Sequence, residues 1–143
     1  MSIAADPFDL DRFLSAQDGV YENALRELRS GQKRSHWMWF VFPQIDGLGN
    51  SFVTKRFAVK SQEEAHHYLQ HPILGTRLLE CTQAVTRLQG RTAPQIFGTP
   101  DDLKFCSSMT LFEVVAGANS EFSLALDQYY SGRRDAATLQ LLG

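Results

Sequence analysis

Apolar residues recur at steps of three and four through most of the chain, which is the spacing of an amphipathic helix. The clearest run is formed by Leu74, Leu78, Cys81, Val85 and Leu88. Shorter runs with the same spacing lie at 10–14, 21–28 and 122–129. No comparable stretch alternates apolar and polar residues, as a half-buried strand would. The pattern therefore predicts an all-α fold.

Capping residues divide this pattern into about eight short helices. Helix starts are predicted at Asp6, Asp18, Ser51, Ser61, His71, Thr99, Asn119 and Asp135. Gly31 and Gly90 are natural stops because glycine readily adopts the left-handed conformation that ends a helix. Ser61 and Glu64 have the spacing of a capping box. With no linker or low-complexity tract, we expect one domain over residues 1–143.

Two stretches are rich in residues that favour strands, namely Trp37–Phe42 and Thr110–Val115. The first is closed by Pro43, and it is too short for its periodicity to separate a strand from a buried helical turn. Gly75 interrupts the clearest helical pattern. We expect the start of that helix to be bent or closely packed, because glycine otherwise destabilises a helix.

Composition narrows the classes of function. A net charge of −2 argues against general nucleic-acid binding, because such domains are usually strongly basic. Cys81 and Cys106 have the spacing of neither a zinc site nor a disulfide scaffold, and we expect both thiols to be reduced and buried. No apolar run approaches the roughly 18–20 residues that span a bilayer. Because residues 1–11 also lack the layout of a secretory signal, we expect a cytoplasmic protein without a membrane partner.

The stretch 33–44 holds the densest group of candidate site residues. It combines two cations and a histidine with two tryptophans and two phenylalanines. Indole rings offer flat surfaces to a base or sugar, and cations bind phosphate or carboxylate. The candidate ligand-binding residues here are Lys33, Arg34, Trp37, Trp39 and Gln44. His36 is a candidate general acid or base near neutral pH. The alternative is a buried aromatic core segment that is preceded by solvated cations.

The stretch 101–110 is the second candidate. On a helix, Lys104, Ser107 and Ser108 share one face, which suits an anionic or polar ligand. Asp102 is the candidate proton-transfer group beside His36. An ordinary solvated helix face is the alternative interpretation.

Other chemistry is disfavoured by missing motifs. The chain has no nucleophile elbow, so a serine hydrolase is not expected. It also lacks the phosphate-binding glycine motifs and the paired-histidine motif of zinc enzymes, although His67 and His71 are four residues apart. Neither a metal nor another cofactor is expected.

Basic residues form two local groups in the sequence. They are Arg26, Arg29, Lys33 and Arg34 in one group, and Lys55, Arg56 and Lys60 in the other. If the fold brings such groups together, they attract an anionic ligand. Solvated surface positions are the alternative.

Several motifs occur in order along nearly the whole chain. They are FDLDRF at 8–13, KRSHWMWFVFPQ at 33–44, GLG at 47–49, HPILG at 71–75, IFG at 96–98 and SSMTLF at 107–112. On these motifs the chain resembles the bacterial calpastatin-like family called domain of unknown function 1810. The resemblance implies a small all-α fold without an assigned reaction.

The chain is also loosely similar to the family proposed to process NAD- and ADP-ribose-linked metabolites. There too an early aromatic segment pairs with a later helix that carries lysine and methionine. The motif of that family has a glutamate before the histidine, where this chain has Ser35.

Two hypotheses for the function follow. The first is binding or processing of a nucleotide-like phosphorylated small molecule, related to ADP-ribose, in a hollow that both candidate segments share. The second is a non-enzymatic protein-interaction module that exposes the apolar block. The sequence leaves open whether the protein is an enzyme, and its oligomeric state.

Overall fold

The computed structural model describes residues 5–143, and over these residues the chain forms helices and no strand. The elements are α1 (Asp11–Gln17), α2 (Tyr21–Ser30), α3 (Met38–Val41), α4 (Phe52–Phe57), α5 (Gln62–Gln70), α6 (Leu74–Thr86), α7 (Ala93–Phe97), α8 (Asp101–Ala116), α9 (Glu121–Tyr130) and α10 (Ala136–Leu142). The predicted all-α class is confirmed. Residues 1–4, which the single-domain and signal-peptide predictions also covered, lie outside the described part of the chain.

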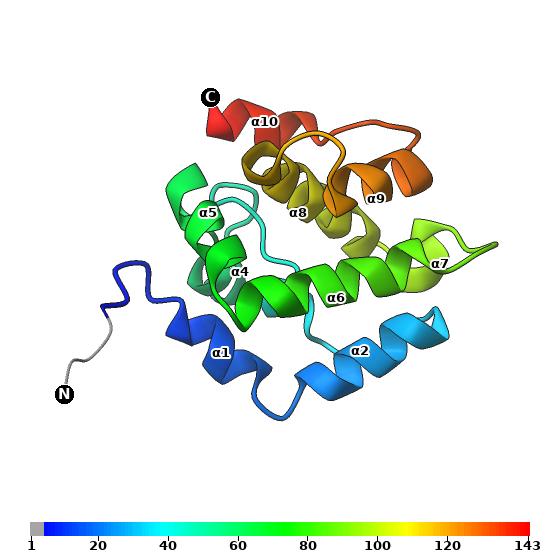
Figure 1. Cartoon of the computed structure of the whole chain (residues 1–143), viewed down its shortest axis with the longest axis horizontal. Coiled ribbons are helices and arrows are strands. Elements are labelled where there is room, and N and C mark those ends of the chain that lie inside the picture. The colour runs from blue at the N-terminus through cyan, green and yellow to red at the C-terminus, as the bar shows by residue number, and fades with distance from the viewer. Residues whose placement is uncertain (1–4) are drawn as a thin grey trace.

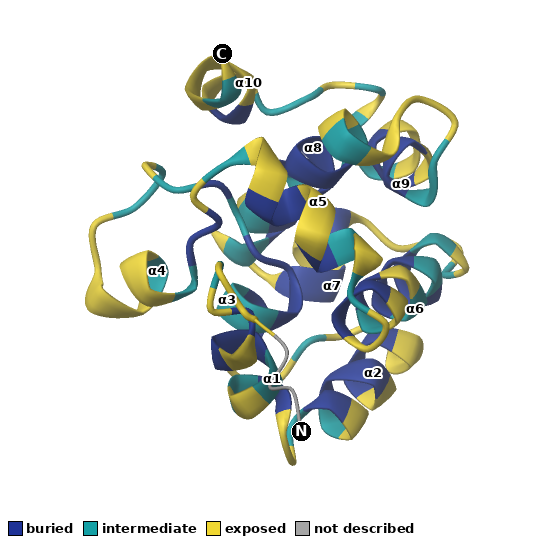
Figure 2. Ribbon diagram, turned by 60° about the vertical axis from the view of Figure 1, so that its left-hand side comes forward, coloured by how far each residue is buried: buried dark blue, intermediate teal, exposed yellow. Residues whose placement is uncertain are grey.

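Helix α8 is the centre of the arrangement. It contacts α5, α7, α9 and α10, while α2 packs against the outer side of α6 (Figure 1). Because neighbours surround it, α8 buries side chains around most of its circumference, including Phe105, Thr110 and Leu111. A helix enclosed in this way has no single apolar stripe. Figure 2 shows α8 as a largely buried segment, whereas α4 projects at the edge and α10 lies on the outside.

The two stretches rich in strand formers are both helical. Thr110–Val115 lies within α8, where packing on several sides outweighs strand propensity. Trp37–Phe42 contains the single turn α3. The only bridge of strand type in the described part of the chain is isolated, and it joins Ile45 to Val59.

Three predicted helix starts have the expected side-chain cap. Asp6 is not among them, because it accepts from the backbone N–H groups of Leu10 and Asp11 while the N-cap of α1 is Leu10. The confirmed caps are Ser51, Ser61 and Asp135, which accept from the backbone N–H groups of Thr54, Glu64 and Thr138 respectively. Local signals are reliable here because a cap bonds to backbone only two or three residues away.

Four other local predictions were wrong. Ser120 rather than Asn119 caps α9, and Asn119 has a positive φ of 66°. Helix α2 begins after Val20 without the predicted side-chain cap from Asp18. Helix α6 ends at Thr86, before Gly90. The capping box at Ser61 is incomplete, because Glu64 instead bonds to the N–H of Lys60 and to Arg12.

Close packing explains the glycine in the first turn of α6. A Cβ atom placed on Gly75 would lie 2.0 Å from the backbone oxygen of Leu69 in α5. The predicted close approach is therefore confirmed. We expect Gly75→Ala to lower the free energy of unfolding by about 1–3 kcal/mol, because backbone must shift to admit the methyl group. Urea denaturation measures this change. An equally or more stable variant, which is the result expected from helix propensity alone, would contradict the packing argument.

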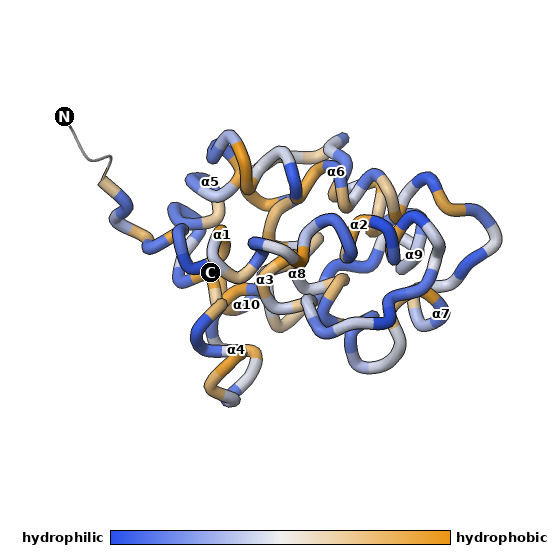
Figure 3. The backbone as a smooth tube through the Cα atoms, turned by 90° about the horizontal axis from the view of Figure 1, so that it is seen from below, coloured by the Kyte–Doolittle hydropathy of each residue, from blue (hydrophilic) through white to orange (hydrophobic). Residues whose placement is uncertain are grey.

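The segment between Ile45 and Val59 projects from the rest of the molecule, and we call it the α4 excursion. Backbone bonds close its base, where Asp46 N donates to Val59 O and Val59 N donates to Gln44 O, both at 2.8 Å. Helix α4 within it buries no residue, and Phe52 is 82% exposed. Figure 3 shows hydrophobic positions in α4 although it lies at the edge of the molecule. The GLG motif at 47–49 thus belongs to a projecting structure.

Within the described residues, no helix has both the length and the apolar character required to cross a membrane.

Candidate functional site

The two segments singled out in the sequence meet in space. The ammonium of Lys33 lies 2.9 Å from one carboxylate oxygen of Asp101, and the ammonium of Lys104 lies 3.3 Å from the other. Lys104 also stands over the indole ring of Trp39, 5.0 Å from its centroid. We call Lys33, Trp39, Asp101 and Lys104 the Lys33–Lys104 cluster. It joins the loop before α3 to the first turn of α8.

Accessibility divides this cluster into an inner and an outer part. The side chain of Lys33 is 8% exposed, and its ammonium also donates to the backbone oxygen of Ser35 and lies over Trp37. The side chain of Lys104 is 26% exposed, and Trp39 is half-buried. Lys33 is therefore mainly a partner of Asp101. Lys104 and Trp39 form the part that a ligand can reach.

Glu27, in α2, organises the loop that carries Lys33. Its carboxylate accepts from the backbone N–H groups of Arg34 and Ser35, from the Ser35 hydroxyl and from the indole N–H of Trp37, all within 3.0 Å. Asn23 donates to it as well. Burial alone would raise the pKa of Glu27, but these donors outweigh burial and lower the pKa to about 2. Glu27 is therefore an ionised anchor for the segment.

The sequence interpretation did not include Glu27 or Asp101 in the site. One signal for Glu27 existed, since it lies three residues after Ala24, on the apolar face of its helix. A charged residue there is buried only when it has partners. Asp101 opens the second candidate stretch, but no role was assigned to it. Its ion pair with Lys33 depends on how the loop before α3 packs against α8, which no local pattern indicates.

The apolar block of the first segment faces inward. Trp37, Met38 and Phe42 are fully buried, while Trp39 and Phe40 are partly exposed. Phe42 packs edge-on against Phe105 of α8, with ring centroids 4.9 Å apart. The block does not form the exposed apolar surface that the protein-interaction hypothesis predicted.

The polar residues predicted on α8 lie deeper than Lys104. Ser107 donates to Leu103 O and to Asp135, and Ser108 is fully buried. Asp102 is 8% exposed and its backbone oxygen accepts from the hydroxyl of Tyr130. Among residues 5–143, the Oδ1 atom of Asp102 and the hydroxyl of Ser108 have no hydrogen-bond partner. These groups are not at the surface where Lys104 and Trp39 are accessible.

The remaining predicted residues of the first segment differ in exposure. Arg34 and His36 are exposed. Gln44 is half-buried and lines a small hollow with Trp39, Thr54 and Phe57, whose volume of about 10 Å³ holds no more than about one water molecule. The accessible part of the site is thus a surface around Trp39 and Lys104.

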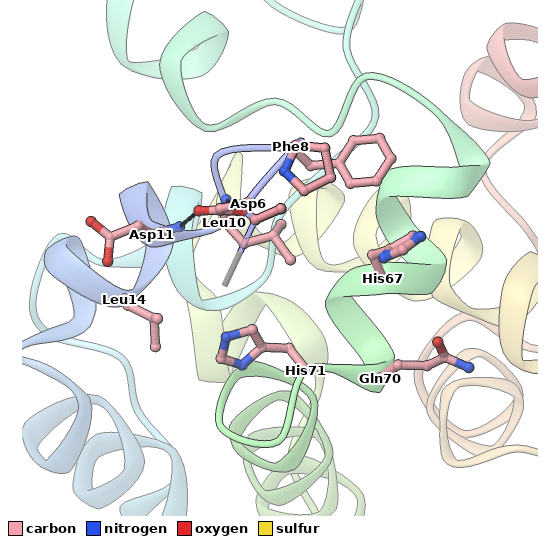
Figure 4. A pocket seen from close by; sticks show the side chains of 10 residues that line it. Asp6, Phe8, Leu10, Asp11, Leu14, His67, Gln70 and His71 are labelled. Atoms are coloured by element: carbon pink, nitrogen blue, oxygen red, sulfur yellow. Dashed lines mark hydrogen bonds between the residues drawn. The ribbon is translucent and has the colours of Figure 1, made fainter. Parts of the chain in front are cut away.

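A larger hollow lies elsewhere, between the N-terminal segment and the end of α5 (Figure 4). It has a volume of about 610 Å³, and His67 and His71 line it together with Asp6 and Phe8. The Nδ1 atom of His71 accepts from the N–H groups of Ile73 and Leu74, just where α6 begins. No predicted ligand-binding residue borders this hollow. Over residues 5–143, no three histidine, cysteine or acidic side chains are grouped closely enough to hold a metal ion.

Neither cysteine has the properties of a reactive thiol. Both are free; Cys81 is fully buried and Cys106 is partly exposed, contrary to the expectation that both are buried. Burial raises the pKa of Cys81 to about 12 and that of Cys106 to about 11. Because the thiolate is the nucleophile, both thiols are inert near neutral pH.

Fold and site together define a small all-α protein with a lysine–aspartate–tryptophan cluster at the start of its central helix. The chain belongs to the family described as Protein of unknown function (DUF1810), whose model matches residues 7–142. This membership confirms the predicted resemblance to domain of unknown function 1810. The family is defined without an assigned function, so the calpastatin and ADP-ribose similarities stay predictions.

A solved structure is similar over almost the full length. It is the crystal structure of a conserved hypothetical protein from Mycobacterium tuberculosis, with 55% sequence identity and a TM-score of 0.94. The match covers 96% of this chain and 98% of that protein. No curated protein matches the chain. The fold is therefore shared with a protein that is described as conserved and hypothetical.

Proposed function

We propose that this protein binds a nucleotide-like phosphorylated small molecule, with ADP-ribose as the first candidate, at the Lys33–Lys104 cluster. The observation that carries the proposal is the position of Lys104, whose ammonium lies beside the half-buried ring of Trp39 and is held there by Asp101. A cation next to an aromatic face suits a ligand that has both a phosphate and a flat ring.

Charge and rigidity support this site. Two lysines against one aspartate leave the cluster with a net positive charge, and exposed Arg34 lies next to Lys33 in the chain. Glu27 fixes the loop that carries Lys33, which lowers the cost of ordering it on binding. If the ligand is also processed, exposed His36 is the accessible proton-transfer group, whereas Asp102 is buried.

Tryptophan fluorescence and thermal denaturation test the proposal. We expect ADP-ribose or ADP to quench the emission of Trp39 and to raise the melting temperature, because a ligand that binds only the folded state stabilises it. Lys104→Met should weaken binding by about tenfold or more, the effect of losing one charge-assisted bond to phosphate. Trp39→Phe should remove the fluorescence response, since Trp37 is buried.

Arg133→Met is a matched control, because Arg133 is exposed and its loss also removes one positive charge. It should bind the nucleotides as the unaltered protein does. Two results would contradict the proposal. One is the absence of any thermal shift at millimolar nucleotide. The other is equal affinity in Lys104→Met and Arg133→Met.

A further inference from the structure

A second hollow, lined by basic residues, lies beside the N-terminal segment. It has a volume of about 420 Å³. Pro7, Phe8 and Asp9 form one wall, and the basic residues Lys55, Arg56 and Lys60 belong to the other, at α4 and the turn before α5. We call this hollow the basic groove. The second group of basic residues noted in the sequence thus lies around one cavity.

Arg12 holds the walls of the basic groove together. Its guanidinium donates to the backbone oxygens of Phe8 and Asp9 on one side, and of Arg56 and Ala58 on the other, at 2.6–2.8 Å. It also donates to Glu64 at 2.7 Å. These bonds occupy the guanidinium, and they fix the walls before any ligand arrives. A rigid groove loses less entropy on binding than a mobile one.

The charges that remain available in the groove are mainly positive. Arg12 and Glu64 neutralise each other, with side chains only 6% and 2% exposed. Arg56 lies 3.8 Å from Asp9, and Lys60 lies 3.7 Å from Asp46, but all four of these side chains are about half exposed or more. Such surface ion pairs contribute little free energy, so an incoming anion readily displaces the carboxylates from Arg56 and Lys60. The groove is therefore positive although the whole chain has a net charge of −2.

We propose that the basic groove binds a small organic phosphate. Lys55, Arg56 and Lys60 hold the phosphate, and Pro7 and Phe8 provide an apolar wall for its organic part. The cavity volume lies within the roughly 300–1,000 Å³ of typical small-molecule sites. No residue of the Lys33–Lys104 cluster lines the groove, so this site does not depend on the proposed function.

Asp9 allows a test by gain of affinity. Asp9 is the carboxylate in the groove that pairs with a basic wall residue, and its φ of 50° is a conformation that asparagine also tolerates. In calorimetric titrations with phenyl phosphate at low ionic strength, Asp9→Asn should bind about three- to tenfold more tightly, because one nearby like charge is removed. The double variant Lys55→Gln and Arg56→Gln should bind at least about tenfold more weakly.

Control variants separate binding in the basic groove from an effect of overall charge and from binding at the Lys33–Lys104 cluster. Glu22→Gln removes one negative charge from an exposed position on α2 and should leave the affinity for phenyl phosphate unchanged. Because phenyl phosphate also has the phosphate and ring that suit the Lys33–Lys104 cluster, the titrations are repeated in the Lys104→Met background, where the effects of Asp9→Asn and of the double variant should persist. Inorganic phosphate should bind more weakly than phenyl phosphate, because it does not contact the apolar wall. The proposal is overturned if Asp9→Asn and Glu22→Gln behave alike, or if the folded double variant keeps its affinity.

Discussion

Replacing Arg12 with methionine is expected to lower the free energy of unfolding by about 3–5 kcal/mol, the range for breaking a buried ion pair from one side. Arg12 and Glu64 are almost completely buried, and their contact is 2.7 Å long. Without the guanidinium, Glu64 keeps a buried charge, and four backbone oxygens lose a donor. Urea denaturation monitored by circular dichroism measures the loss.

Two further variants separate charge from geometry at this position. Arg12→Lys keeps the charge but cannot replace the planar fork, so it should still lose a large part of the stability. Adding Glu64→Gln to Arg12→Met should recover part of the loss, because no unpaired charge then remains buried. Arg56→Met, at an exposed arginine, should change stability by less than about 0.5 kcal/mol. Similar losses in Arg12→Met and Arg56→Met would refute the role of Arg12.

Replacing Glu27 with alanine is expected to cost at least about 3 kcal/mol at pH 7, because one buried donor and three partly buried donors lose their acceptor together. These donors are two backbone N–H groups, one hydroxyl and the indole of Trp37. Glu27→Gln keeps one acceptor oxygen and should give an intermediate loss. Glu22→Gln, on the exposed side of the same helix, should have almost no effect.

The contribution of Glu27 should also depend on pH. Its pKa in the folded protein is lowered to about 2, below the usual 4.5 of the unfolded chain. The ionised carboxylate of Glu27 therefore makes its full contribution to the free energy of unfolding above the pKa of the unfolded chain. This contribution is lost as the pH falls towards 2. The difference in unfolding free energy between the unaltered protein and Glu27→Ala should narrow over that interval. A constant difference from pH 6 to pH 2.5 would show that the carboxylate charge is not the cause.

The candidate site could be anticipated only in part. The two segments were recognisable because Trp39 and Lys104 belong to stretches with more polar and aromatic residues than a core requires. Their meeting through Asp101 was not recognisable, since it joins residues far apart in the chain. The exposure of each residue was equally hidden, because Trp37 and Trp39 look equivalent in the sequence, yet Trp37 is fully buried and Trp39 is partly exposed.

The sequence by itself determined that this protein is helical and where several helices begin, and it marked Gly75 as a point where a helix is bent or closely packed. The physical reason is that a helix closes its hydrogen bonds within four residues, so that caps and apolar spacing act locally. Only the tertiary structure decided which polar groups become partners. Packing of α1 against the base of the α4 excursion buries Arg12 with Glu64, and packing of α2 against the loop before α3 gives Glu27 its donors. Such pairs depend on distances between elements, which the order of residues does not show.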